Sequence, residues 1–134
     1  MLVDAGVWIA SASSSEPRSQ AARALLREPK NKVAALDLTL YEVANTLTGR
    51  FGQPRAAETL TDAIISRCYD GRFVRVDDGI LRGAVEIARE FEISVYDAAY
   101  VSAARARGWR LISLDVRDLV SKGLAVTPDA ALYP

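Results

Sequence analysis

Short apolar runs alternate along the chain with longer segments whose apolar side chains recur at helical spacing. The short runs are rich in Val, Ile, Leu and Phe, the composition that buried strands favour. Strands that alternate with helices in this way are typical of an α/β protein built on a parallel sheet. We predict strands at residues 2–3, 33–36, 73–76, 110–114 and 124–126.

The segments between these strands show the spacing that one buried helix face requires. In residues 39–51, Leu40, Val43, Leu47 and Phe51 fall at i, i+3, i+7 and i+11. No repeat, low-complexity tract or linker interrupts the pattern, so we expect residues 1–134 to form a single domain. We predict helices at residues 16–28, 39–51, 54 to about 69, 77 or 78 to 91 and 96–107, with a short helix after Asp115.

Composition removes several kinds of catalysis. The 134 residues include no histidine, which excludes Ser–His–Asp and Cys–His catalysis, histidine general bases and histidine-containing zinc sites. The single cysteine, Cys68, cannot form an internal disulfide or a cysteine-rich metal site. If the chain is an enzyme, its chemistry must use carboxylates, hydroxyls, amines or a hard metal ion.

Net charge and hydropathy bear on whether the chain binds a nucleic acid or a membrane. Seventeen basic residues balance seventeen acidic ones, so no global positive field attracts a nucleic acid. The basic residues are 14 Arg and three Lys, a bias that suits phosphate contacts but also follows from GC-rich coding. No apolar run approaches about 18 residues, and the N-terminus lacks the basic region of a signal peptide. We therefore expect no membrane span and a cytoplasmic location.

Four acidic residues stand out by position: Asp4, Glu42, Asp97 and Asp115. Asp4 and Asp115 each follow a predicted strand, where either could simply cap a helix. The segments Thr39-Leu-Tyr-Glu42 and Ser94-Val-Tyr-Asp97 match the capping-box pattern. Capping is therefore a sufficient explanation for each acid taken alone.

Taken together, the four acids predict a site. The carboxyl ends of parallel strands share one sheet edge, and with right-handed connections the helices carrying Glu42 and Asp97 start there too. Carboxylates that converge in one cleft repel one another unless cations neutralise them. Oxygen ligands without imidazole or thiolate select Mg²⁺ or Mn²⁺, ions that serve phosphoryl chemistry.

The same residues resemble a known family, the PIN domains, and more narrowly the VapC toxins of VapBC toxin–antitoxin pairs. The resemblance spans the whole chain and rests on the order of its motifs, each of which is short: Leu-Val-Asp4, Leu-Thr-Leu-Tyr-Glu42-Val-Ala-Asn45, Tyr-Asp97-Ala-Ala-Tyr100 and Leu-Ile-Ser113-Leu-Asp115. It implies a three-layer α/β/α PIN-like fold, with a central, mainly parallel sheet of about five short strands, in a single PIN domain over residues 1–134.

The resemblance further implies a metal-dependent endoribonuclease. Asp4, Asp97 and Asp115 would hold one or two Mg²⁺ ions, roughly 4 Å apart if two, and Mn²⁺ could replace Mg²⁺. Glu42 would bind the metal or a water held on it, and hydrolysis of the RNA would leave a 5′-phosphate and a 3′-hydroxyl. The partners implied are a small VapB-like antitoxin and a second copy of the chain, and the apolar side chains available for contact are Leu47, Phe51, Leu60, Ile64, Ile65 and Tyr69.

Three further residues are expected to support the acids. Asn45 lies one turn after Glu42 and could orient its carboxylate, and Ser113 stands two residues before the last acid. Ser113 could equally be an outward strand hydroxyl. Asp118 is either a fifth metal ligand or a first-turn acid that complements a helix dipole. One departure is Gly6, where PIN domains commonly carry Ser or Thr.

The weaker predictions concern substrate contacts and alternative functions. Backbone clamps for RNA are expected among four arginines, which could also be ordinary solvated charges: Arg18, Arg50, Arg55 and Arg105. One alternative is a phosphoacceptor receiver domain, although Asp4 stands alone where such domains have an acidic pair and Lys122 is poorly placed. A second alternative is a catalytically silent PIN-like interaction module.

Overall fold

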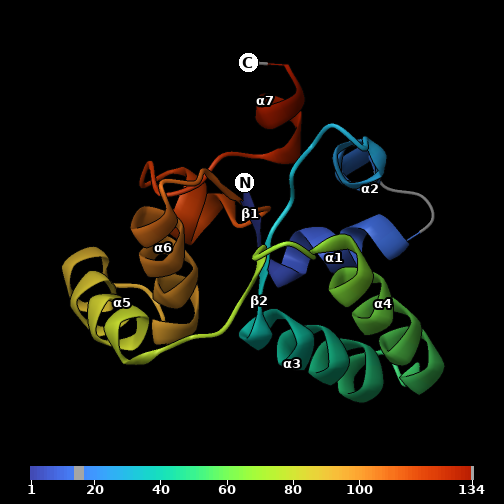
Figure 1. The fold of residues 1–134 in the computed structure, drawn as a ribbon, viewed down its shortest axis with the longest axis horizontal. Helices are drawn as coiled ribbons and strands as arrows, with labels where there is room; N and C mark the ends of the chain where they lie inside the picture. The colour runs from blue at the N-terminus through green and yellow to red at the C-terminus, as the bar shows by residue number, and fades with distance from the viewer. Residues whose placement is uncertain (14–16, 134) are drawn as a thin grey trace.

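The computed structural model describes residues 1–13 and 17–133, so the predicted helix start at Glu16 lies outside the described residues (Figure 1). Strands and helices alternate as the sequence predicts. The elements are β1 (Leu2–Val3), α1 (Ala5–Ala12), α2 (Pro17–Arg27), β2 (Ala35–Leu36), α3 (Asp37–Asn45), the π-helical η1 (Thr46–Arg50), α4 (Pro54–Arg67), β3 (Phe73–Val74), α5 (Asp78–Phe91), α6 (Val95–Arg107), β4 (Leu111–Ile112), the π-helical η2 (Val116–Val120) and α7 (Pro128–Leu132).

The strands are parallel, and β1 lies near the middle of the sheet. β1 pairs with β4 and β2 pairs with β3, while a bridge between Leu2 and Ala34 joins the two pairs. The chain therefore moves outward from β1 through β2 and β3, and later returns to the other side of β1 as β4. In open parallel sheets, this reversal of strand order marks the place where ligands bind.

The sheet has fewer strands than predicted. Within the described residues four strands form, and the expected strand at 124–126 contributes only a bridge between Val126 and Ile112. Its ladder ends at once because Thr127 caps α7 and Pro128 has no N–H to donate. The strand predicted at 73–76 ends early for a similar reason, since the Val76 N–H donates to Asp37 Oδ1 at 3.1 Å.

Successive strand residues point into two separate cores. Leu2, Leu36 and Val74 pack against α5 and α6, while Val3 and Ala35 pack against the helices of the other face. Figure 1 shows α5 and α6 on one side of the strands and α1, α2 and α4 on the other. Because both faces are covered, the strands are apolar throughout. The three-layer α/β/α arrangement is confirmed.

Two helices were missing from the sequence prediction. α1 follows β1 directly and buries Ala5, Val7 and Trp8, but its sequence Ala-Gly-Val-Trp-Ile-Ala-Ser-Ala has no charged face that would reveal a helical period. The five-residue α7 is too short to show one. In the part of the chain that is described, no helix is long and apolar enough to cross a membrane.

Candidate active site

Two of the predicted acids sit at the carboxyl ends of the neighbouring strands β1 and β4. Asp4 caps α1, and its Oδ1 accepts the Val7 N–H at 3.0 Å. Asp115 caps η2, and its Oδ1 accepts the Asp118 N–H at 2.9 Å. The expected capping contacts therefore form, but each engages a single carboxylate oxygen. Asp4 also meets the Ser113 hydroxyl, and both acids lie where the strand order reverses.

Glu42 is not a capping residue, which corrects the capping-box interpretation. α3 begins at Asp37, two residues before the predicted start, so Glu42 lies in the second turn and out of reach of the helix end. Its Oε1 is buried, with no hydrogen-bond partner among the described residues. A buried carboxylate oxygen without a donor is costly, and it marks a place where a ligand could bind.

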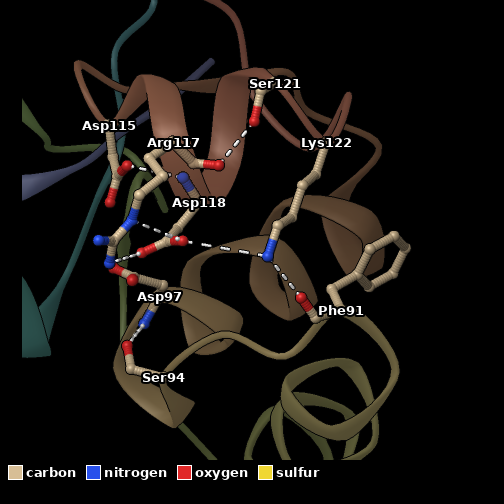
Figure 2. Close-up of polar contacts among 8 residues, drawn as sticks. All are labelled: Phe91, Ser94, Asp97, Asp115, Arg117, Asp118, Ser121 and Lys122. Atoms are coloured by element: carbon tan, nitrogen blue, oxygen red, sulfur yellow. Dashed lines mark hydrogen bonds and ion pairs between the residues drawn. The ribbon is translucent and has the colours of Figure 1, made fainter.

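Asp97 lies in the first turn of α6, where Ser94 is the N-cap. The Asp97 N–H donates to Ser94 Oγ at 3.0 Å, which is one half of the predicted capping box. One oxygen each from Asp97, Asp115 and Asp118 lies within 4.8 Å of the others, a spacing that a single cation could bridge. Figure 2 shows these three carboxylates directed toward a common space between α6 and η2. The structure thus brings Asp118 beside two of the predicted acids.

Burial and mutual repulsion make the inner acids hard to ionise. The pKa of Asp4 is raised to about 6, chiefly by burial and to a smaller extent by the charges of Asp97 and Asp115. Hydrogen bonds from Ser113 and Val7 lower the pKa but do not cancel this rise. Burial also raises the pKa of Glu42 to about 7, opposed by the Tyr100 hydroxyl and reinforced by Asp4 and Asp97. The pKa of Asp97 is raised, first by burial and then by Asp115 and Asp118. Nearby positive charge would therefore favour the ionised forms of these acids.

The supporting residues occupy different positions relative to these acids. Ser113 is completely buried, its Oγ accepts the Asp115 N–H at 3.0 Å, and its hydroxyl lowers the pKa of Asp4, so it connects two of the acids. Asn45 is exposed at the end of α3. Together with Glu42 it lines an open cavity of about 390 Å³ whose other walls are Leu38, Tyr41 and Tyr96.

The predicted arginine clamps do not gather at the acids. Arg105 lies about 12 Å along α6 from Asp97, where its guanidinium covers the Phe91 ring at 5.8 Å. Arg18, Arg50 and Arg55 are exposed on α2, η1 and α4.

Sequence reasoning missed the arginine that does reach an acid. Arg117 Nη2 lies 3.0 Å from Asp118 Oδ2 and its Nε lies 3.2 Å from Oδ1, as Figure 2 shows. Its position two residues after Asp115 was the available signal.

Gly6, the departure from the family pattern, faces the first acid. A Cβ at this position would lie 3.4 Å from Asp4 Oδ1, an ordinary contact, so a side chain there would stand beside the carboxylate. The glycine instead leaves the end of a groove of about 490 Å³ open between α1, η1 and α4.

Comparison with known proteins places the chain in a family. The sequence profile of the PIN domain matches residues 1–121. The chain belongs to the PIN-domain family, as the order of its motifs indicates.

A relative within that family is a VapC protein, and several solved structures share the fold. The chain is 33% identical to Ribonuclease VapC3 of Pyrobaculum aerophilum, over 96% of this chain and 98% of that protein. Its fold matches the crystal structure of VapC20 of Mycobacterium tuberculosis, a sarcin-ricin loop cleaving toxin, with TM-score 0.74, 22% identity and coverage of 91% and 94%. A toxin–antitoxin complex from Klebsiella pneumoniae matches with TM-score 0.71, 18% identity and coverage of 95% and 96%. The chain is thus a VapC-like PIN-domain protein, and the receiver-domain alternative is set aside.

Proposed function

We propose that this protein is a Mg²⁺-dependent endoribonuclease of the cytoplasm that acts as the toxin of a toxin–antitoxin pair. The observation that carries the proposal is the convergence of acids at the carboxyl edge of the sheet, at the strand reversal. One oxygen each from Asp97, Asp115 and Asp118 lies within 4.8 Å of the others. Asp4 and Glu42 come from two further segments, and their pKa values respond to the charge of Asp97. The relationship to Ribonuclease VapC3 supports RNA as the substrate.

The side chains present fit a hard divalent cation. The donors are carboxylate oxygens alone, which Mg²⁺ and Mn²⁺ prefer. Glu42 Oε1 is buried and has no hydrogen-bond partner in the described part of the chain, and the pKa values of Asp4 and Glu42 are raised. A cation beside these carboxylates would favour their ionised forms. A bound divalent ion would supply the positive charge that activates a water and stabilises the phosphate as it is attacked.

The chain's own residues hold the ion and orient the reactants. We assign Asp4, Asp97 and Asp115 to ion binding, with Asp118 beside them, and Glu42 to the ion or to the attacking water. Ser113 orients Asp4 and Asp115, and Asn45 lines the open side of Glu42. Hydrolysis leaves a 5′-phosphate and a 3′-hydroxyl. Arg117 has a guanidinium at the acids and is better placed than Arg105 to contact the RNA backbone.

A nuclease assay with defined RNAs tests this function. We expect cleavage with Mg²⁺, loss of cleavage after chelation and recovery when Mg²⁺ or Mn²⁺ is restored. Asp97→Asn should lose activity, whereas Asp62→Asn, which changes an exposed acid on α4, should not. Equal cleavage with and without metal would refute the metal dependence. A well-folded protein that binds Mg²⁺ but cleaves no RNA would favour the silent interaction module.

The antitoxin is proposed to bind the groove between α1, η1 and α4. Leu47 and Ile64, which were considered for this contact, belong to the core, whereas Phe51, Ile65 and Tyr69 are each 49–60% exposed. An amphipathic segment could cover such a surface and place a basic side chain near Asp4. The groove is lined by Gly6, Ile9, Ala10, Ala12, Ser13, Ser19, Leu47, Phe51, Gln53 and Ala56. Copurification with a small neighbouring-gene product that Phe51→Asp releases would support this assignment.

A homodimer is proposed to form through a separate apolar face next to the acids. This face surrounds a shallow, almost wholly apolar groove of about 290 Å³ between α3, α5 and α6. Leu81 is 48% exposed and Tyr96 is 66% exposed, so a partner copy would bury apolar area that now contacts water. The side chains of the face are Leu38, Tyr41, Val76, Leu81, Val95 and Tyr96.

The single PIN domain is proposed to extend beyond the matched residues 1–121 to the end of the chain. Ala125 is buried in the core beneath α5 and α6, and Val126 packs on the opposite core. The Val126 N–H donates to the Leu111 carbonyl at 2.9 Å, so this segment adds to the edge of the sheet.

A further inference from the structure

A pair of buried hydroxyl groups lies directly behind the acids. Thr39 Oγ1 on α3 and Tyr100 Oη on α6 are 3.0 Å apart and joined by a hydrogen bond across 61 positions of sequence. Thr39 is fully buried and Tyr100 is 1% exposed, so water does not compete for this bond. The bond is therefore a fixed link between two helices that are far apart along the chain.

The link is close to an acid on each helix. Glu42 lies three residues after Thr39, and Asp97 lies three residues before Tyr100. Residues three apart on a helix share a face, so each hydroxyl neighbours the acid of its own helix. One hydrogen bond thus joins the helix that carries Glu42 to the helix that carries Asp97.

The Thr39 end of this link is itself held by the backbone. The Leu36 N–H donates to Thr39 Oγ1 at 3.2 Å, which occupies one lone pair of the hydroxyl. The hydrogen-bonded connection therefore runs from Leu36 at the end of β2, through Thr39 on α3, to Tyr100 on α6.

We propose that Thr39 and Tyr100 are positioning residues, whose hydrogen-bonded hydroxyls set the spacing of α3 and α6 and so hold Glu42 and Asp97 in position at the cation site. The proposal rests on the function proposed above. Partners that orient a ligand in this way commonly change metal affinity by about 10-fold to 100-fold when they are removed. Neither residue touches the RNA in this assignment.

Fold stability and metal affinity can be separated by substitution. Thr39→Val would leave the buried Leu36 N–H without its acceptor, a loss of stability unrelated to the link. Tyr100→Phe retains the ring and the bond between Thr39 and Leu36, and it removes only the link. Thr39→Ser retains the hydroxyl and is the conservative control.

Mg²⁺ titration calorimetry, with thermal melting in chelator, tests the proposal. We expect Tyr100→Phe to melt cooperatively in chelator, to bind Mg²⁺ about 10-fold or more weakly than the wild type, and to lose kcat with little change in KM. Thr39→Ser should retain near wild-type affinity. Wild-type Mg²⁺ affinity in a folded Tyr100→Phe variant, or equal loss in Thr39→Ser, would overturn the positioning role. A wild-type protein that binds no Mg²⁺ would instead overturn the proposed function on which it rests.

Discussion

The buried carboxyl of Asp4 allows a substitution that should stabilise the metal-free protein. Asp4 is 9% exposed, and its pKa is raised from an ordinary 3.8 to about 6, mainly by burial. At about 1.4 kcal/mol per pKa unit, ionisation of this group costs about 3 kcal/mol of folding free energy. Asn has nearly the same shape and is an equally good N-cap, so Asp4→Asn retains the Val7 N–H bond and removes the charge.

The sign and pH range of the effect follow from proton linkage. Because the folded state holds the Asp4 proton more tightly than the unfolded chain, stability falls as pH rises from about 4 to about 6. Below pH 4 the carboxyl is protonated in both states, so the cost disappears. The full cost is present at pH 8.

Urea denaturation in chelator at pH 8 and near pH 4 measures this difference. At pH 8 we expect Asp4→Asn to be more stable than the wild type by about 3 kcal/mol, a rise in Tm of roughly 10 °C. The advantage should shrink toward zero at the lower pH, and Asp62→Asn should show neither effect. An Asp4→Asn protein that is less stable at pH 8, or whose difference from wild type does not depend on pH, would refute the reasoning.

Three further predictions use other parts of the structure. Mg²⁺ should raise the Tm of the wild type, and Asp97→Asn should reduce that rise. If Mg²⁺ raises the Tm of the variant as much as that of the wild type, Asp97 has only a helix-capping role. Gly83→Ala places a Cβ 2.5 Å from Ser102 Oγ between α5 and α6 and should cost about 1–3 kcal/mol by urea denaturation. Adding Ser102→Ala should recover part of that loss, and no recovery would exclude this clash as its cause. Leu81→Asp should shift sedimentation from dimer to monomer, whereas a dimer that persists would place the interface elsewhere.

The sequence alone located the acids and the elements that carry them. Strands of apolar residues and helices with one apolar face have local periods, so both can be found without a structure. Asp4 and Asp115 were predicted at strand ends and Asp97 in a first turn, and the structure places them there. Their joint presence at one sheet edge follows from parallel strands and right-handed connections.

Local patterns misled where a helix end or a helix face was ambiguous. Thr39-Leu-Tyr-Glu42 looks like a capping box, but α3 begins at Asp37 and puts Thr39 inside the helix, in contact with Tyr100. α1 was missed because its uniformly apolar and small residues show no polar face. In both cases the packing of the segment, rather than its composition, decided the outcome.

Only the tertiary structure decided how the acids are held and which other side chains join them. It buried Glu42 Oε1 with no donor among residues 1–13 and 17–133, and it brought Asp118 beside Asp97 across 21 positions of sequence. It also linked Thr39 to Tyr100 and placed Arg117 at the cluster. These relations depend on how whole helices pack on the two faces of the sheet. A local period states which face of a helix is buried, but not which distant side chain it will meet.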